Sequence, residues 1–346
     1  MDFKEFIGDR KKINVGFLGG SITEGAGSSS NEFCYARMVC KRLGDIYKDT
    51  DFECINAGVG GTTSALGLFR MKRDLLSKKP DIVFVEFAVN DTEFSSTGIY
   101  MENIVRVVKK YNKNIPVIIL LTTTTTVVDK YGAMKNAPSG REHIKLAEYY
   151  GLELINIGDD MYDKALKDNI DFNSLFTDGV HPNDRGHDIY SEIIVERLKN
   201  TDFNDKDINM PLLYGRSFEK PELVMANTLA DDTWKLSYNN MYARLPDYIY
   251  SFTPGDELFF EFKGSFLGLY YTIEKDSGTI EYKIDDEEWH EMSMWDKYAL
   301  QFNRAAFGIL SEKLEDRVHR VTIRNIKKKA DKSEGFYVRI GAFAVG

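Results

Sequence analysis

Val15-Gly16-Phe17-Leu18-Gly19-Gly20-Ser21-Ile22-Thr23 is the stretch from which the fold of the amino-terminal part can be worked out. Apolar residues at positions 15, 17 and 18 predict a short buried strand, and the paired glycines end it. Ser21 then stands at the carboxyl end of that strand, where open sheets of alternating strands and helices place their ligands. We interpret Ser21 as a nucleophile that the remaining chain supports, although a serine here could also only cap the helix that follows.

Strands and helices alternate over the rest of the amino-terminal part. We expect strands at residues 52–56, 81–88, 116–121 and 153–157, and helices at residues 33–47, 64–76, 99–111, 141–150 and 188–198. This alternation predicts an α/β fold, in which a parallel sheet is covered by helices on both faces. We interpret the run of threonines at residues 122–126 as the end of a strand, and Glu86, which interrupts an apolar strand, as a paired structural carboxylate and not a catalytic one.

The sequence pattern changes near residue 200. Residues 200–209 are polar and resemble a linker, and the chain beyond residue 215 consists of short, aromatic, alternating runs. The runs at residues 258–262, 267–273, 279–284, 318–323 and 336–343 predict strands of an antiparallel, jelly-roll-like β-sandwich. We therefore divide the chain into an α/β domain at residues 1–205 and an all-β domain at residues 206–346.

The composition narrows the classes of partner. The net charge of −9 argues against nucleic acid, because phosphate backbones need basic patches. The longest strongly apolar run, residues 115–121, is too short to cross a bilayer, so we expect no membrane partner. The cysteines, Cys34, Cys40 and Cys54, have neither disulfide-framework nor zinc-site spacing, and no leader segment is evident, which favours a cytoplasmic location. Homo-oligomerisation is left open.

Four short segments carry the residues needed for attack by a serine. They are residues 19–21, 56–63, 88–91 and 178–182. The first three follow successive strands, so their ends should meet at one edge of the sheet, and the fourth lies in the loop before the last helix. A serine hydroxyl needs a base and the base needs an acceptor on its other nitrogen, roles that we assign to His181 and Asp178.

An attacked ester carbonyl also develops a negative charge on its oxygen, which requires preorganised donors. The candidates are the backbone N–H groups of Ser21 and Gly61 and the side-chain amide of Asn90. This chemistry requires neither a metal nor an organic cofactor, and we expect none.

The four segments resemble the four blocks of the SGNH hydrolase superfamily, also called GDSL esterases and lipases, in family order over residues 13–200. The resemblance implies a flavodoxin-like three-layer α/β/α sandwich. It also implies that Ser21 is the nucleophile, that Gly61 and Asn90 join it in the oxyanion hole, and that Asp178 and His181 complete the triad. Two departures stand out: the usual Gly-Asp-Ser is Gly19-Gly20-Ser21, and the usual Gly-x-Asn-Asp is Ala88-Val89-Asn90-Asp91.

The all-β part resembles, at residues 262–270 and 278–285, the jelly-roll accessory domains of some carbohydrate esterases of that superfamily. The resemblance implies a serine esterase that removes small acyl groups, acetyl above all, from small-molecule or oligosaccharide esters. Three alternatives stay open: a lipid or thioester hydrolase, a carbohydrate-binding or assembly protein with a spent active site, and acyl transfer in place of hydrolysis.

Overall fold

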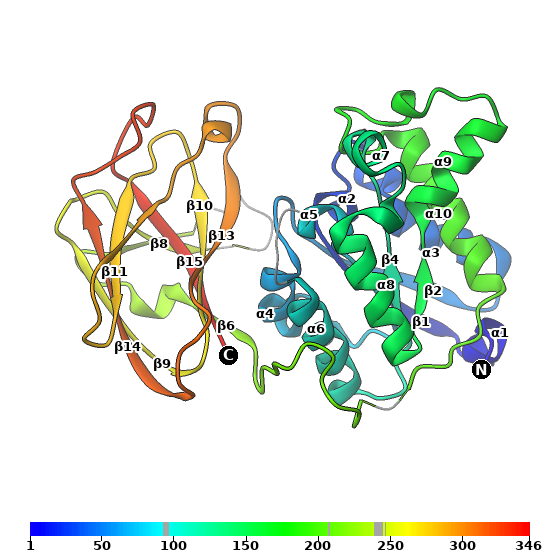
Figure 1. Ribbon diagram of the computed structural model, residues 1–346, viewed down its shortest axis with the longest axis horizontal. Helices are drawn as coiled ribbons and strands as arrows, with labels where there is room; N and C mark the ends of the chain where they lie inside the picture. Colours follow the sequence, from blue (N-terminus) through cyan, green and yellow to red (C-terminus); the bar gives the residue numbers. More distant parts are fainter. Residues whose placement is uncertain (93–96, 207, 239–244, 246) are drawn as a thin grey trace. The chain divides into compact units, whose positions relative to one another are not determined.

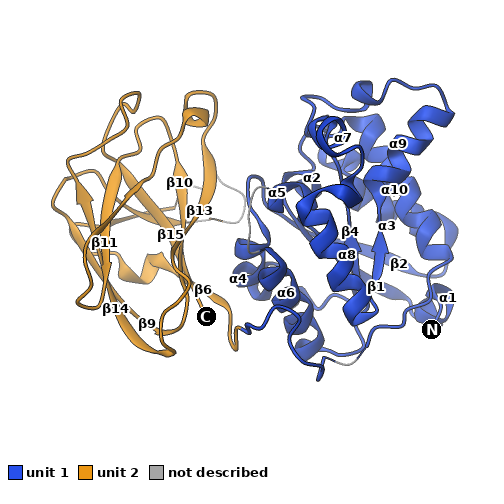
Figure 2. Cartoon of the chain, viewed as in Figure 1, with its two compact units in different colours: residues 1–217 blue, residues 218–346 orange. Residues whose placement is uncertain are grey.

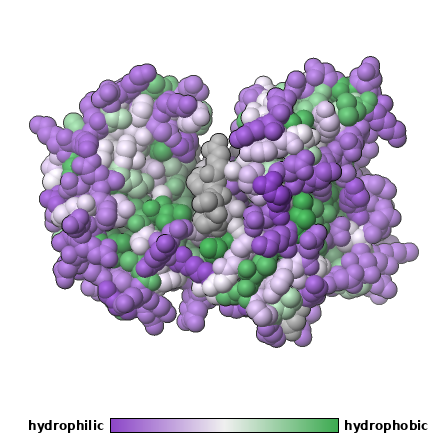
Figure 3. All heavy atoms as spheres, in the orientation of Figure 1, coloured by the Kyte–Doolittle hydropathy of each residue, from purple (hydrophilic) through white to green (hydrophobic). Residues whose placement is uncertain are grey.

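The computed structural model describes residues 1–92, 97–206, 208–238, 245 and 247–346 (Figure 1). The chain forms two compact units, residues 1–217 and residues 218–346 (Figure 2). Among the described residues, no helix combines the length and the apolar character needed to cross a bilayer. Polar residues cover much of the face of each unit that Figure 3 shows, with smaller apolar areas between them.

The first unit is built on a parallel sheet with strand order β2-β1-β3-β4-β5. This is the flavodoxin-like order, as predicted. The strands are β1 (Lys12–Gly19), β2 (Asp51–Gly58), β3 (Ile82–Glu86), β4 (Val117–Leu120) and β5 (Glu153–Ile155). In the register of the sheet, Gly19 of β1 lies opposite Gly58 of β2 on one side and Glu86 of β3 on the other. The carboxyl ends of these three strands therefore meet at one edge.

Helices cover both faces of this sheet, which confirms the α/β assignment (Figure 1). One group packs together around a core that includes Phe17 of β1; it comprises α1 (Phe3–Ile7), α3 (Tyr35–Ile46), α9 (Ile157–Lys167) and α10 (Asp184–Lys199). The other group comprises α4 (Ser64–Asp74), α6 (Thr97–Tyr111) and α8 (Pro138–Tyr150), which contact one another. Three short helices, α2 (Ser21–Glu24), α5 (Ala88–Asp91) and α7 (Thr125–Tyr131), follow strand ends. Turns of 3-10 helix occupy Asn31–Phe33, Leu76–Lys78, Met134–Asn136, Phe172–Leu175, Ala226–Leu229 and Lys297–Leu300.

The threonine run is not a strand end, in contrast to our interpretation of the sequence. Strand β4 stops at Leu120, and the side chain of Thr124 caps α7 by accepting the backbone N–H of Val127 at 3.0 Å. A threonine hydroxyl at this position satisfies a backbone donor that the first turn of a helix leaves unpaired. The run therefore starts a helix that the low helix propensity of threonine conceals in the sequence.

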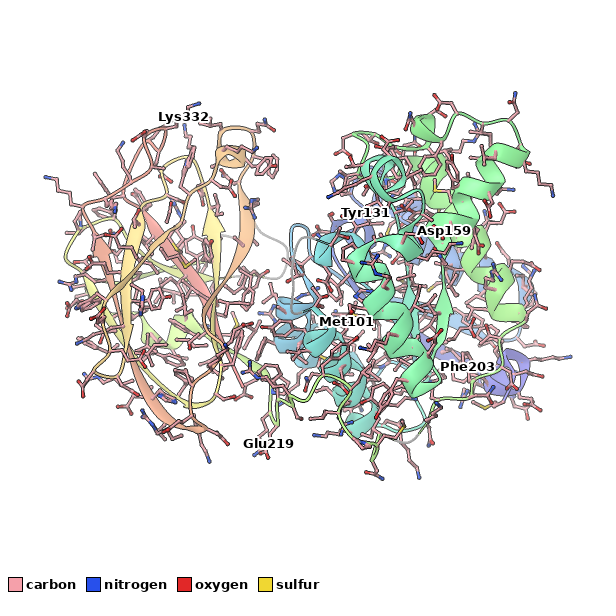
Figure 4. All side chains as sticks on the ribbon, viewed as in Figure 1. Met101, Tyr131, Asp159, Phe203, Glu219 and Lys332 are labelled. Atoms are coloured by element: carbon pink, nitrogen blue, oxygen red, sulfur yellow. The ribbon has the colours of Figure 1, made fainter. Side chains whose placement is uncertain are left out.

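The boundary between the units lies later than the predicted division between residues 205 and 206, because the segment up to Ser217 packs on the first unit. The backbone N–H groups of Leu213 and Tyr214 donate to the carboxylate of Glu102 on α6, at 2.7 and 2.9 Å. The Tyr214 hydroxyl donates to Glu142 on α8 at 2.6 Å. At the other end of the unit, the ring of Phe203, labelled in Figure 4, contacts the phenylalanines of α1.

The second unit is all-β, as predicted, and consists of two antiparallel sheets. One has the order β13-β10-β15-β8-β7, with β6 also paired to β15, and the other has the order β12-β11-β14-β9. The rings of Phe260 on β9 and Phe343 on β15 stack at 4.4 Å, so the two sheets share a core, which also contains the fully buried Trp234. The strands are β6 (Glu222–Met225), β7 (Lys235–Ser237), β8 (Tyr248–Ser251), β9 (Glu257–Gly264), β10 (Leu267–Ile273), β11 (Thr279–Ile284), β12 (His290–Ser293), β13 (Arg304–Ser311), β14 (Arg317–Ile326) and β15 (Val338–Val345).

Candidate active site

Ser21 is the first residue of α2 and follows β1 after a single residue, Gly20. The two glycines before it are required by close packing. A Cβ atom on Gly19 would lie 2.1 Å from the Thr23 hydroxyl oxygen, and one on Gly20 would lie 2.2 Å from Oδ1 of Asn90. Both distances are too short for any side chain, so only glycine lets Thr23 and Asn90 approach the turn that presents Ser21.

The loop that carries His181 is anchored to the loop that follows Ser21. The Thr177 hydroxyl donates to the carbonyl oxygen of Gly27 at 3.0 Å. Gly27 has a φ of +91°, and a Cβ atom there would lie 2.3 Å from the carbonyl oxygen of Pro182 and 2.8 Å from Cβ of His181. Gly27 therefore allows the two loops to touch, both by its backbone conformation and by its lack of a side chain.

The structure brings Ser21, His181 and Asp178 into one line of hydrogen bonds. Nε2 of His181 lies 2.9 Å from Oγ of Ser21, across 160 positions of the sequence. Nδ1 of His181 lies 2.7 Å from Oδ2 of Asp178. An ionised Asp178 accepts a hydrogen bond from Nδ1–H and so keeps the proton on Nδ1, which leaves Nε2 free to accept a hydrogen bond from the serine hydroxyl.

Asp178 is held in the position that this tautomer requires. Its Oδ1 accepts the backbone N–H groups of Val180 at 3.0 Å and of His181 at 2.8 Å. Partial burial alone would raise the pKa of Asp178, but the backbone and ring donors of His181 outweigh it and hold the pKa below its ordinary value. The carboxylate is therefore ionised at neutral pH, where the imidazole needs it.

Three donors next to Ser21 are unused within the described residues. The backbone N–H groups of Ser21 and Gly61 and the Nδ2 atom of Asn90 donate no hydrogen bond there. Gly61 reaches this arrangement through a φ of +69°. The neighbouring Gly60 is different, because its N–H donates to the carboxylate of Glu24 at 2.8 Å. Of these two glycines, Gly61 is the one whose backbone N–H has no acceptor among the described residues.

Other contacts that hold the site together left no signal in the sequence. The backbone N–H and the hydroxyl of Thr125 both donate to the carbonyl oxygen of Gly179, at 2.9 and 3.1 Å, which ties the Asp178–His181 loop to α7. Ser29 donates through its backbone N–H and its hydroxyl to the carboxylate of Asp184, at 2.7 and 2.6 Å. These pairs join segments that are 54 and 155 positions apart, so no local spacing could have predicted them.

A buried arginine fixes the strand ends on which the site stands. Arg70 on α4 is fully buried and donates to the carbonyl oxygens of Ala57 at 2.6 Å and Gly19 at 2.9 Å. It also pairs with the buried Asp74 at 3.3 Å. Its guanidinium therefore joins the carboxyl ends of β1 and β2, from which the loops of Ser21 and Gly61 leave the sheet. Among the described residues, no group of three or more His, Cys, Asp or Glu side chains is arranged to hold a metal ion.

Comparisons with known proteins agree with this architecture. The sequence profile of the GDSL-like Lipase/Acylhydrolase family matches residues 17–189, half of the chain. No curated protein sequence matches significantly. A solved two-domain esterase active on acetylated mannans is 25% identical, with a TM-score of 0.81 over 97% of this chain and 92% of that chain. A structure with the same description, co-crystallised with mannopentaose, is 23% identical, with a TM-score of 0.82 over 99% of this chain and 92% of that chain. An acetyl xylan esterase is 26% identical and matches 54% of this chain and 99% of its own, with a TM-score of 0.46.

Proposed function

Since the chain belongs to the GDSL-like lipase/acylhydrolase family and is a carboxylic ester hydrolase, we propose that it is a serine esterase that removes acetyl groups from oligosaccharides. The observation that carries the proposal is the line of hydrogen bonds from Ser21 through His181 to Asp178, at 2.9 and 2.7 Å. The three unused donors beside Ser21 supply what the reaction needs next, a place for a developing oxyanion.

In the proposed mechanism, Nε2 of His181 removes the proton from Ser21 as its Oγ attacks the ester carbonyl carbon. The carbonyl oxygen becomes an oxyanion and accepts hydrogen bonds from the free N–H groups of Ser21 and Gly61 and from Nδ2 of Asn90. The tetrahedral intermediate collapses as the imidazolium gives its proton to the ester oxygen of the sugar, and the sugar leaves with a free hydroxyl. Water activated by His181 then attacks the acetyl-serine and releases acetate.

The choice of substrate rests on the neighbours and on the second unit. Two of the similar structures are described as esterases active on acetylated mannans, and they match both units of this chain. We therefore propose acetylated oligosaccharides, with manno-oligosaccharides as the first to be tested.

Kinetics of the Ser21→Ala variant test the assignment. With 4-nitrophenyl acetate as substrate, we expect the variant to lose activity by a factor on the order of a million, the loss seen when a triad nucleophile is removed. A Ser21→Ala protein that keeps wild-type turnover would overturn the proposal.

An acyl-chain series and a glycan substrate separate the alternatives. We expect acetyl esters to be turned over faster than esters with chains longer than butyrate, and acetate to be released from acetylated manno-oligosaccharides. Preference for long chains would favour a lipid or thioester hydrolase. Binding of the oligosaccharide without release of acetate would favour a spent site, and acetyl groups that reappear on a second sugar would indicate acyl transfer.

A further inference from the structure

A buried carboxylate lies directly beneath the turn that carries Ser21. Glu86 is the last residue of β3, and only 1% of its surface is exposed. The sequence suggested that it is paired, but among the described residues no lysine or arginine forms an ion pair with it. Its partners are hydrogen-bond donors alone. A buried negative charge is costly unless hydrogen bonds satisfy its oxygens, so the residues that donate those bonds show which segments the carboxylate keeps in place.

The donors come mainly from the nucleophile turn. The Thr23 hydroxyl on α2 donates to Oε2 at 2.8 Å, and the backbone N–H of Gly20 donates to the same carboxylate. Thr122, which follows β4, donates to Oε1 at 2.7 Å. The residues immediately before and two positions after Ser21 are therefore both tied to one buried side chain.

A tyrosine extends this network in a fixed direction. The hydroxyls of Thr23 and Tyr35 lie 2.8 Å apart, and both residues are fully buried. Because the single proton of the Thr23 hydroxyl goes to Glu86, Tyr35 must donate to Thr23. The chain from Tyr35 through Thr23 to Glu86 runs from α3 through the nucleophile helix to the sheet, and it fixes the rotation of α2 about its axis.

We propose that Glu86 is a positioning residue, which holds the Gly20–Thr23 turn so that Oγ and the backbone N–H of Ser21 face the reacting ester. This inference deepens the proposed function and rests on it. Glu86 does not touch the substrate in this account; it acts through Gly20 and Thr23. A displacement of the turn by a fraction of an ångström would misplace both the nucleophile and one oxyanion donor, and reaction rates are steeply sensitive to such shifts.

The electrostatics separate this role from a purely structural one. Burial raises the pKa of Glu86, the hydroxyl and backbone donors oppose the rise, and the charge of Asp91 adds to it. A carboxyl group whose pKa is higher in the folded than in the unfolded state costs stability once the pH exceeds its unfolded value. Loss of the charge at neutral pH therefore removes a cost, and a neutral variant should lose activity out of proportion to any loss of stability.

Two graded substitutions at position 86 test the proposal with 4-nitrophenyl acetate. We expect kcat to fall roughly tenfold in Glu86→Gln, which keeps one acceptor, and roughly a hundredfold in Glu86→Met, which keeps none, with KM little changed in both. Thr23→Val removes the hydroxyl donor that belongs to the nucleophile turn, and we expect it to resemble Glu86→Gln. The double variant Thr23→Val/Glu86→Gln should be no slower than the slower single variant, because both changes break the same link.

Thr122→Val is the matched control. It removes a hydroxyl donor from the same carboxylate at a nearly identical distance, but from a residue outside the nucleophile turn. We expect its kcat to stay within about threefold of wild type. If Thr122→Val and Glu86→Gln lower kcat equally, or if Glu86→Gln matches wild type, Glu86 has no positioning role. If the wild-type protein itself fails to hydrolyse the ester, the proposed function is wrong, and the role proposed for Glu86 is wrong as well.

Discussion

Gly20 stands where the superfamily usually has an aspartate, and the structure predicts that a side chain at this position strongly lowers activity. A Cβ atom at this position would lie 2.2 Å from Oδ1 of Asn90, whereas ordinary contacts begin at 3.4 Å. The amide of Asn90 would have to retreat by about 1.2 Å, the difference between the two distances. Displacement of a reacting group by that much costs about a hundredfold in rate, and loss of one oxyanion donor costs about a hundred- to a thousandfold.

We therefore expect Gly20→Ala to lower kcat/KM for 4-nitrophenyl acetate roughly a hundredfold, and Gly20→Asp at least as much. The control is Gly44→Ala, because a Cβ atom on that glycine of α3 would meet open space. Thermal unfolding followed by circular dichroism shows whether each variant is folded.

A double variant tests whether the methyl group of Gly20→Ala lowers activity by displacing Asn90. Asn90→Ala removes the amide that the new methyl group would strike, so Gly20→Ala/Asn90→Ala should be no slower than Asn90→Ala alone. Gly20→Ala at wild-type rate would refute the steric argument, and a double variant much slower than Asn90→Ala would show that Gly20 acts by another route.

Three further predictions follow from buried or anchoring contacts. Burial lowers the pKa of His187 to about 4, so its neutral form stabilises the fold above pH 6.5, and that stability is lost as the pH falls towards 4. The free energy of unfolding in urea should therefore differ less between pH 7 and pH 5 in His187→Gln than in the control variant His290→Gln, which changes an exposed histidine. Arg70→Met should cost roughly 3–5 kcal/mol in unfolding free energy, because it removes the buried partner of Asp74 and the donor to the carbonyl oxygens of Ala57 and Gly19, whereas the more exposed Arg73→Met should cost clearly less. Thr125→Val removes a 3.1 Å hydrogen bond to the loop that carries His181 and should lower kcat by about fivefold with KM unchanged. A change in KM alone would argue against a role for this contact in placing His181.

The sequence was sufficient to predict the sheet, and it pointed to the side chains that the structure brings together, for an identifiable reason. Ser21, Gly61 and Asn90 each follow a strand end marked by an apolar run, as at Gly19-Gly20-Ser21, so their positions follow from the parallel topology. Asp178 and His181 are close in sequence, and their contact needs only a tight turn. The part of the site that could be predicted is therefore the part that depends on strand order or on local geometry.

The remaining contacts depend on packing between distant segments. The approach of the two site loops requires Gly27, which nothing in its own neighbourhood marks as different from other glycines. The boundary between the units is set by the bonds from residues 213 and 214 to Glu102, more than a hundred positions away. Strands β6, β7 and β12 have only three or four residues, too few for their alternation to stand out. Helix α9 begins after Asn156 with the sequence Ile-Gly-Asp-Asp, whose glycine and aspartates conceal its apolar face.

The account depends most directly on the covalent step, and mass spectrometry of the intact protein can observe it. Wild-type protein mixed with 4-nitrophenyl acetate and quenched with acid within milliseconds should gain the mass of one acetyl group, and peptide mapping should locate it on Ser21. The His181→Ala variant should gain no such adduct on the same time scale. An acetyl group found on another residue, or rapid hydrolysis with the same yield of adduct in His181→Ala, would contradict the proposed catalytic unit.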